Sequence, residues 1–361
     1  MERMIYNIFR GKTVLVTGHT GFKGSWLALW LSELGADVCG YSLPPDTDPN
    51  HYSVAKISER LESECINDIR DRRTLADYIR QIKPDCIFHL AAQPIVRRSY
   101  TEPAETFESN VMGSIYLMDA VRLLKNPCSV VMITSDKCYE NTGKREGYTE
   151  TDPMGGYDPY SASKGCAELA IAAYRRSFFG KNNDVNIASV RAGNVIGGGD
   201  WAEDRIIPDA VRAVVNGKEL YIRNPSAIRP WQHVLEPLSG YLLLAAKMLS
   251  GDSSKNEGWN FGPVSDSKVS PSTVMEIINM FYSHWQKGKA VYDPENLNLH
   301  EAAYLTLSSE KSEKLLGWKQ QWNLSETVNR TADWYMKFYD GHDATELSLC
   351  DINDYSRNLR Y

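Results

Sequence analysis

The chain has 361 residues, of which 42% are hydrophobic and 24% charged, a composition typical of a globular protein with a substantial core. Its formal net charge of -6, from 40 basic and 46 acidic residues, argues against nucleic acid or an anionic membrane as the main partner. The seven cysteines are scattered and form no C-x-x-C pair, so we expect reduced thiols, no metal site and a cytoplasmic location. The most apolar helical stretch, residues 241–249, is too short to span a bilayer.

Short apolar runs alternate with helix-length segments through the first half of the chain. Five runs are rich in β-branched residues and bounded by turn or charge signals, at residues 13–17, 37–41, 86–90, 129–133 and 186–190. Buried parallel strands have this composition, and the helix-length spacers predict an α/β fold built on a Rossmann-type doubly wound parallel sheet. The first helix is expected to start near Gly21 and to end at Gly35.

The alternation stops after Arg191, where the glycine-rich loop GNVIGGGDW follows. Beyond it we expect helices over residues 205–216, 267–285 and 309–316, a short strand at 220–223, and a loosely organised tail after His342. The prediction is therefore a dinucleotide-binding domain at residues 1–191 with a return segment at about 232–265. A smaller C-terminal α/β domain for the substrate would consist of residues 192–231 and 266–361.

The segment VLVTGHTGFKGSW places Gly18, Gly21 and Gly24 directly after the first strand and at the start of the first helix. Glycines at this spacing let the backbone approach a pyrophosphate, and the helix N-terminus supplies N–H donors. His19 and Lys23 would bring bulk and charge beside the phosphates. The residues expected around the dinucleotide are Gly18, His19, Thr20, Gly21, Phe22, Lys23, Gly24, Ser42, Asp68, Ile69, Ala91 and Ala92, with Tyr160 and Lys164 at its nicotinamide end.

The end of the second strand, VCGYSL, offers no carboxylate for the adenine ribose, where an NAD site usually has Asp or Glu. Ser42 is the polar side chain available there. The sequence therefore leaves the choice between NAD and NADP open.

Tyr160 and Lys164 are four residues apart, so they share one face of the helix predicted to contain them. A cation beside a phenol favours the phenolate, which suits the tyrosine to take a proton from an alcohol. Upstream, Ser135, Asp136 and Lys137 follow a predicted strand at the edge of the sheet where α/β folds bind ligands. The pattern predicts oxidation of an alcohol, assisted by the Ser135 hydroxyl.

Taken together, these segments resemble the extended short-chain dehydrogenase/reductases that act on nucleotide sugars, and among them the CDP-glucose 4,6-dehydratases. The resemblance runs from about Gly11 to about Trp334 and is carried by TGHTGFKGSW, TSDKCYEN, DPYSASKGCAEL, SVRAGNVIGGGDW and RPWQHVLEPL. Such dehydratases usually have Thr-Asp-Glu where this chain has Ser135-Asp136-Lys137, and the lysine is typical of the CDP-glucose branch.

This resemblance implies a hydro-lyase that converts CDP-glucose to a 4-keto-6-deoxy sugar with tightly held NAD. Tyr160 would deprotonate the 4-hydroxyl during oxidation, Lys137 would remove the proton from carbon 5, and Asp136 would protonate the departing 6-hydroxyl. Lys137 can act in this way only while it is neutral. The chemistry usually feeds 3,6-dideoxyhexoses of surface polysaccharides.

The resemblance also implies substrate contacts. Asn194 and Arg229 match positions that hold the diphosphate, and Asn110 matches an asparagine that braces the active-site strands. The full set of expected substrate-binding residues is Gln93, Arg97, Asn110, Asn194, Arg205, Arg229 and His300.

Three alternatives remain open. The chain could be another nucleotide-hexose 4,6-dehydratase acting on GDP-mannose or dTDP-glucose, a 4-epimerase, or a non-catalytic NAD(P)-binding protein. Relatives commonly form homodimers through two helices per subunit, which here would be residues 106–125 and 161–178, and a tetramer is the further possibility. The apolar residues of these helices are equally compatible with packing inside one subunit.

Overall fold

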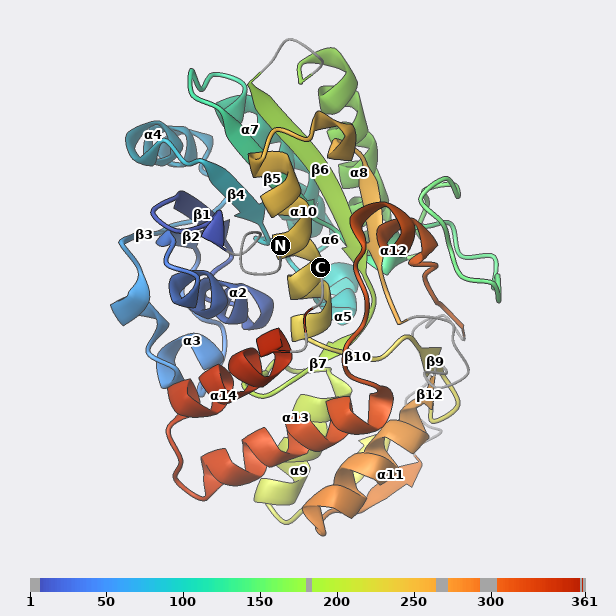
Figure 1. Cartoon of the computed structure of the whole chain (residues 1–361). Helices are drawn as coiled ribbons and strands as arrows, with labels where there is room; N and C mark the ends of the chain where they lie inside the picture. Colours follow the sequence, from blue (N-terminus) through green and yellow to red (C-terminus); the bar gives the residue numbers. More distant parts are fainter. Residues whose placement is uncertain (1–6, 180–183, 264–271, 293–303, 358, 360–361) are drawn as a thin grey trace.

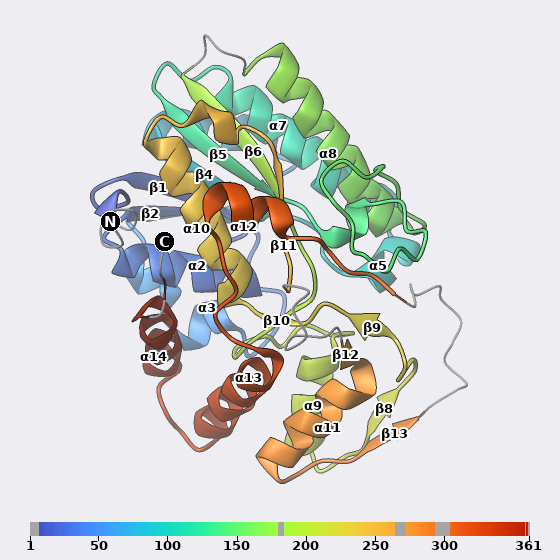
Figure 2. The ribbon, with the colours of Figure 1, turned by 45° about the vertical axis from the view of Figure 1, so that its right-hand side comes forward.

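A computed structural model describes residues 7–179, 184–263, 272–292, 304–357 and 359 (Figures 1 and 2). Its centre is a seven-stranded sheet in which every neighbouring pair of strands is parallel. The strands are β1 (Thr13–Thr17), β2 (Asp37–Ser42), β3 (Ser63–Ile66), β4 (Cys86–His89), β5 (Cys128–Ile133), β6 (Val185–Ala192) and β11 (Gly258–Phe261).

The strand order is β11-β6-β5-β4-β1-β2-β3, so the direction of winding reverses between β1 and β4. Leu15 of β1 is paired with Cys39 on one side and with Ile87 on the other. Ligands bind outside the carboxyl ends of the strands at such a reversal. The predicted doubly wound parallel sheet is confirmed.

The two faces of the sheet are buried under different helices because side chains alternate along a strand. Val14 and Val16 point into the core that α2 (Phe22–Glu33) and α10 (Leu235–Leu249) cover, while Leu15 points into the opposite core. That opposite core is covered by α4 (Arg72–Ile82), α7 (Gly113–Val121) and α8 (Pro159–Ser177) (Figure 1).

A smaller group of elements lies beyond the carboxyl edge of the sheet (Figure 2). Its elements are β7 (Val195–Ile196), α9 (Ile206–Val215), β8 (Leu220–Ile222), β9 (Ile228–Arg229), β10 (Gln232–His233), β12 (Ser272–Thr273), α11 (Val274–Trp285), β13 (Ala290–Tyr292) and α13 (Leu324–Tyr339). Short connecting elements are α3 (His51–Val54), η1 (Ile57–Arg60), α5 (Val96–Thr101), α6 (Pro103–Phe107), η2 (Glu108–Met112), η3 (Asp136–Cys138), η4 (Ser253–Lys255) and α12 (Glu310–Leu316). Segment 232–265 returns to the large sheet through α10 and β11, although the division into two domains itself stays a prediction.

Several expectations need correction. The chain after His342 is not loosely organised, because α14 (Ala344–Arg357) packs against α2 and α3. The helix expected over residues 106–125 is interrupted by the π-helical turn η2 between α6 and α7. Strand β3 was not expected, because its residues alternate between half-buried and exposed and form no apolar run. Among the described residues, no helix combines the length and the hydropathy that crossing a membrane requires.

Candidate active site

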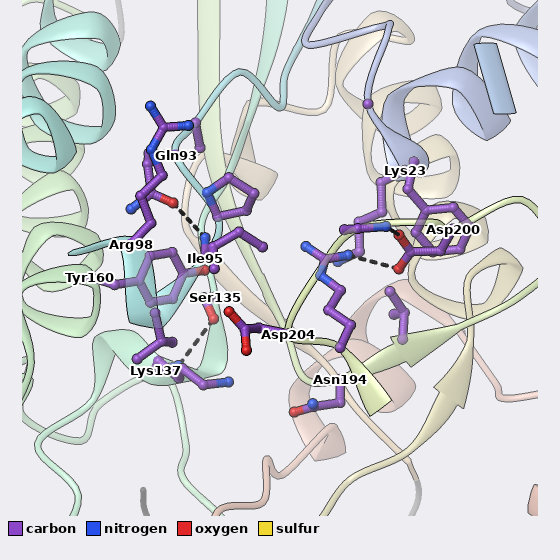
Figure 3. A pocket seen from close by; sticks show the side chains of 18 of the residues that line it. Lys23, Gln93, Ile95, Arg98, Ser135, Lys137, Tyr160, Asn194, Asp200 and Asp204 are labelled. Carbon is purple, nitrogen blue, oxygen red and sulfur yellow. Dashed lines mark hydrogen bonds and ion pairs between the residues drawn. The ribbon is translucent and has the colours of Figure 1, made fainter. Parts of the chain in front are cut away.

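A cavity of about 1090 Å³ opens where the sheet reverses its winding and extends to the smaller group of elements. It is lined by the glycine loop, by the loops that follow β4 and β5, by the start of α8 and by the segment from Ala192 to Asp209. Figure 3 shows Ser135, Lys137 and Tyr160 on one side of the view and Lys23, Asn194 and Asp200 on the other. The cavity therefore brings together segments that are far apart in the sequence.

The glycine loop has the geometry that a dinucleotide requires. Gly18 has φ +74°, and a Cβ there would lie 2.8 Å from the backbone nitrogen of Ala91. A Cβ at Gly24 would lie 2.0 Å from the Gly18 carbonyl oxygen, so only glycine allows α2 to start this close to β1. Gly21 is exposed at the N-terminus of α2, where a pyrophosphate can approach the backbone. These three positions fit a bound dinucleotide.

His19 is not where the sequence suggested. Its side chain is buried and its Nε2 lies 2.9 Å from Glu64 Oε2 on β3, and its side chain does not line the cavity. The ring occupies the space beside Gly40, where a Cβ would come within 2.6 Å of it. Burial lowers the pKa of His19, and Glu64 only partly offsets this effect. The prediction of a charged imidazole side chain beside the phosphates is therefore wrong.

Lys23 does line the cavity, and the charges of other cationic side chains of the cavity act on its amine. Its pKa is lowered to about 7, mainly by burial and to a smaller extent by the charges of Arg205, Lys164 and Lys137, while Asp136 opposes them. Positive charges held together in this way attract an anion such as a diphosphate.

The other predicted cofactor residues form a continuous wall. Thr20, Phe22, Ser42, Asp68, Ile69, Ala91 and Ala92 all line the cavity. The hydroxyls of Thr20 and Ser42 are 2.7 Å apart, and the Asp68 carboxylate is paired with Arg70 at 2.6 Å. That pairing lowers the pKa of Asp68, which keeps it ionised.

Tyr160 and Lys164 both lie on α8, face the cavity and are buried. The Lys164 Nζ is 5.9 Å from the centre of the Tyr160 ring. The pKa of Tyr160 is raised to about 12, mainly by burial and to a smaller extent by Asp136, against the opposite effects of Ser135 and Arg205. Burial also lowers the pKa of Lys164 to about 8. In the protein without cofactor, desolvation thus outweighs the expected lowering of the tyrosine pKa by lysine.

The segment after β5 brings the remaining catalytic candidates to the same place. Ser135 Oγ donates to Asp136 Oδ1 at 3.0 Å and accepts from the Lys137 backbone N–H at 3.3 Å. The Lys137 Nζ lies 3.6 Å from Asp136 Oδ1, with side-chain exposures of 26% and 1%. Asp136 Oδ2 is buried and has no hydrogen-bond partner among the described residues. This oxygen is suited to a group of the substrate.

The predicted substrate residues divide into two groups. Arg97, Asn194, Arg205 and Arg229 line the cavity. Asn110 does not; it is buried, accepts from the Gln93 backbone N–H at 2.8 Å and donates to Ser163 Oγ at 2.8 Å. It thereby ties the loop after β4 to α8, so its side chain does not reach a substrate in the cavity, and the expected bracing of the active-site strands stays a prediction. His300 lies outside the described residues.

Gln93 lines the cavity, but its side chain is already used by its own loop. Its Oε1 accepts from the Ile95 backbone N–H at 2.6 Å, and its Nε2 donates to Thr106 at 2.9 Å. The structure therefore supports a role in shaping the loop.

Sequence reasoning missed several charged residues of the cavity, among them Asp204 and Arg223. Asp204 Oδ1 lies 3.1 Å from Arg97 on α5 and 3.4 Å from Arg223 beyond β8, so it joins opposite walls. No local spacing signals such a contact. Arg205 is paired with Asp200, five residues earlier in the same loop, at 3.0 Å.

Comparisons with known proteins agree with this geometry. The model of a family described as GDP-mannose 4,6 dehydratase matches residues 15–331. The chain is 49% identical to the CDP-glucose 4,6-dehydratase of Salmonella typhimurium over 97% of each chain, and 26% identical to the UDP-glucose 4-epimerase of Mycoplasma genitalium over 91% of this chain and 97% of that protein. The solved dTDP-glucose 4,6-dehydratase of Bacillus anthracis, in complex with NAD, shares the fold with a TM-score of 0.75 and 21% identity, over 91% of this chain and 98% of that one.

The family model covers most of the chain, and the Salmonella relative is similar from end to end. The chain therefore belongs to the nucleotide-sugar dehydratase family that this model describes and, within it, to the family of the CDP-glucose 4,6-dehydratases.

Proposed function

We propose that this chain is a hydro-lyase that converts CDP-D-glucose to CDP-4-keto-6-deoxy-D-glucose and water. The observation that carries the proposal is the meeting of Ser135, Asp136, Lys137, Tyr160 and Lys164 around one cavity, in a chain 49% identical to a CDP-glucose 4,6-dehydratase. The glycine loop and the wall from Thr20 to Ala92 suit NAD as the cofactor. When bound, NAD accepts a hydride from carbon 4 of the glucosyl group and later returns it to carbon 6.

In the first step, Tyr160 takes the proton of the 4-hydroxyl as hydride leaves carbon 4. Its phenolate is costly in this buried site, which raises its pKa to about 12. The nearby Lys164 ammonium and the positive charge of oxidised nicotinamide offset that cost when the site is loaded. Ser135, which lies beside Tyr160 in Figure 3, aligns the hydroxyl by a hydrogen bond.

In the second step, water leaves across carbons 5 and 6. The ketone at carbon 4 acidifies the proton on carbon 5, and the neutral amine of Lys137 takes it. The protonated Asp136 gives its proton to the departing 6-hydroxyl. Lys137 is then an ammonium and Asp136 a carboxylate, which is the ion pair seen at 3.6 Å. Return of one proton from Lys137 to Asp136 restores the reactive pair. As hydride returns to carbon 6, carbon 5 takes a proton from solvent, and this balances the proton of the 4-hydroxyl that Tyr160 releases.

The diphosphate of the nucleotide sugar needs cations and N–H donors. Arg97, Arg205, Arg229 and Asn194 line the part of the cavity that the smaller group of elements closes. Arg97 and Arg205 are now held by Asp204 and Asp200, carboxylates that a diphosphate can replace as a partner. We propose these four residues as its ligands.

We further propose a homodimer formed through α8 and its neighbours. Cys166, Leu169 and Ala173 make an exposed stripe on α8, and Leu169 has 60% of its surface exposed. Leu117 and Val121 of α7 are instead buried within the subunit, so they belong to its own core. A cytoplasmic location and a role in supplying 3,6-dideoxyhexoses for surface polysaccharides stay predictions.

The test is to incubate the purified protein separately with CDP-glucose, dTDP-glucose, UDP-glucose and GDP-mannose, each with and without added NAD. The 4-keto-6-deoxy product is followed by the ultraviolet absorbance that it develops in alkali. Signal with CDP-glucose alone is expected. Signal with another nucleotide alone would keep the mechanism and replace the substrate.

The second candidate is a 4-epimerase, which the Mycoplasma relative and the shared tyrosine and lysine favour. It would change CDP-glucose without any loss of water. No change in any sugar, by protein shown to bind NAD, would favour a non-catalytic binding protein.

A further inference from the structure

A buried ion pair lies directly behind the catalytic residues. Arg191 on β6 and Glu168 on α8 approach to 2.7 Å, and their side chains are 5% and 3% exposed. Burial alone would raise the pKa of Glu168, but Arg191, Thr134 and Ser189 outweigh it and lower that pKa, so both members of the pair are charged. A buried pair of this kind adds little stability over an apolar pair of equal size, and its use is often to fix one arrangement.

The pair holds both ends of the segment that contains Asp136 and Lys137. Thr134, which precedes this segment, donates from its hydroxyl to Glu168 Oε1 at 2.5 Å. Tyr139, which follows it, accepts from Arg191 Nη1 at 2.6 Å. The segment 135–138 is therefore held at both ends by hydrogen bonds to one ion pair: Thr134 bonds Glu168, and Tyr139 bonds Arg191.

Glu168 is also on the helix that presents the other catalytic residues. It lies four residues after Lys164 and eight after Tyr160, about one and two helical turns along the same face. The same carboxylate is therefore fixed with respect to Tyr160 and Lys164 through α8 and with respect to Asp136 and Lys137 through Thr134 and Arg191.

Tyr139, at the C-terminal end of the segment, is held by further contacts. The Tyr139 hydroxyl donates to Asn260 on β11 at 2.8 Å, and its ring stacks on Tyr148 with centroids 5.3 Å apart. The Arg191 guanidinium lies 5.1 Å from the centre of the Tyr139 ring. A segment held in this way has little freedom to change the position of Lys137 relative to Tyr160.

We infer that Glu168 and Arg191, with Thr134 and Tyr139, form a positioning unit that sets the elimination pair Asp136–Lys137 in register with the oxidation pair Tyr160–Lys164. None of the four is a catalytic residue in this account. The inference rests on the proposed function, because only a reaction with both steps at one bound sugar needs this register. Figure 3 shows Ser135 and Lys137 beside Tyr160, as this arrangement requires.

Loosening the unit should separate the two steps. Oxidation depends on the proton transfer at Tyr160 and on Lys164, both on α8, with only an aligning hydrogen bond from Ser135, so it should continue. Elimination should slow because Lys137 is displaced from the proton on carbon 5. Displacements near 1 Å can reduce rates by roughly 100-fold. The signature is a bound, reduced nicotinamide that accumulates during turnover.

The test uses pairs of variants that keep the ion pair intact. Thr134→Val removes one hydroxyl from Glu168 but leaves its contacts with Arg191 and Ser189, and Thr134→Ser retains the hydroxyl. Tyr139→Phe removes the hydroxyl that bonds Arg191 and Asn260 at the C-terminal end of the segment. Thr331→Val removes a buried hydroxyl of α13 that, among the described residues, bonds its own helix at Thr327, and it controls for loss of stability.

We expect Thr134→Val and Tyr139→Phe each to lower kcat with CDP-glucose by about 10-fold or more, with KM within about 2-fold, and with reduced nicotinamide visible in the steady state. Thr134→Ser should recover most of the turnover, and Thr331→Val should lower only the melting temperature. The inference would be overturned if Thr134→Val and Tyr139→Phe both had a lowered melting temperature but kept the wild-type kcat and accumulated no reduced nicotinamide. Wild-type protein that removes no water would instead overturn the proposed function, and the inference with it.

Discussion

The resemblance to other dehydratases implies that Lys137 occupies a position where they usually have a glutamate, and its amine lies 3.6 Å from Asp136. In the proposed reaction these two groups exchange one proton and divide the acid and base roles between them. A lysine base needs its neutral form at the moment of transfer, and a carboxylate beside it supplies that form by taking up the ammonium proton, without a change in net charge. In this division of roles, Lys137 is the base that takes the proton from carbon 5.

Lys137→Met keeps the length of the side chain and removes the amine. We expect kcat to fall by roughly 100- to 10,000-fold, because general base catalysis is lost. Substrate binding should persist, and reduced nicotinamide should accumulate, since oxidation does not need Lys137. Single-turnover absorbance measurements would show both effects.

The matched control is Lys144→Met, which removes another partly exposed lysine paired with an aspartate, Asp152, outside the cavity. It should turn over like the wild type. Lys137→Glu should retain part of the activity, because glutamate is the usual base in relatives. Near-full turnover by Lys137→Met would end the assignment of Lys137 as the base.

Lys23 makes cofactor binding depend on pH. Burial lowers its pKa to about 7, so a large fraction is neutral at neutral pH in the empty cavity. A diphosphate stabilises the ammonium form, so binding takes up a proton and the affinity for NAD should fall as pH rises above about 7, by up to about 10-fold per pH unit. Equilibrium binding of NAD between about pH 6 and 8.5 measures this slope.

Lys23→Met should flatten the dependence, with a smaller slope left by Lys164, whose pKa is about 8. Lys12→Met, at a lysine paired with Asp85 away from the cavity, should keep the wild-type slope. Equal slopes in the wild type and in Lys23→Met would show that another group takes up the proton.

Among the elements, α14 makes contacts that reach the cofactor loop. The His51 ring forms hydrogen bonds with Ser348 of α14 at 2.9 Å and with Ser25 of α2 at 2.8 Å. Ser25 directly follows Gly24 of the glycine loop. Its ring stacks on Trp26 with centroids 4.9 Å apart. The C-terminal helix thus helps to fix the first turn of α2, which the glycine loop enters.

A buried carboxyl attaches α14 to the rest of the protein and should make stability depend on pH. Glu236 accepts from the Tyr355 hydroxyl at 2.6 Å and from the Trp322 backbone N–H at 2.8 Å. Burial raises its pKa to about 7, above the ordinary value of 4.5 that applies to the unfolded chain. The folded state then binds more protons between these pH values, so the free energy of unfolding should fall as pH rises from about 4.5 to 7.

Glu236→Gln should remove most of this slope, because glutamine keeps the neutral form at every pH. The loss in the wild type is roughly 3 kcal/mol at most. Denaturant unfolding at several pH values measures it, and Asp351 of α14, whose pKa is also raised to about 7, should leave a residual slope. The account would be contradicted if the free energy of unfolding changed with pH equally in the wild type and in Glu236→Gln.

Local patterns were sufficient for some elements and some site residues. The strand at 13–17 was predicted with its observed bounds because a short apolar run between turn signals is typical of a buried parallel strand. Tyr160 and Lys164 were paired correctly because residues four apart share one face of a helix. The tail was misjudged because α14 depends on distant partners, such as Glu236 for Tyr355, and not on a strong local pattern.

Contacts between distant segments could not be predicted. Arg97 and Asp204 are 107 residues apart, and nothing in either segment signals the other. The same holds for the burial of His19 against Glu64, where the local motif suggested a place beside the phosphates. The pKa of Tyr160 also depends on burial by the whole site, which the spacing of two residues does not reveal.

At the scale of the whole molecule, the exposed stripe on α8 predicts a dimer. Leu169→Arg should place a charge at its centre and give monomers, as measured by light scattering during gel filtration. Leu315→Arg, at a leucine of α12 that is 56% exposed, is the control and should stay dimeric. A monomeric wild type, or a Leu169→Arg variant that is still dimeric, would rule out this interface.

The central claim is that one bound sugar is oxidised at carbon 4, loses water across carbons 5 and 6, and regains the same hydride at carbon 6. The most direct measurement is to convert CDP-glucose that carries deuterium on carbon 4 and to locate the label in the product by NMR. The account predicts deuterium on carbon 6 of a 4-keto-6-deoxy product, with no net reduction of NAD. Deuterium that stays on carbon 4 of a sugar that has kept its 6-hydroxyl would contradict it.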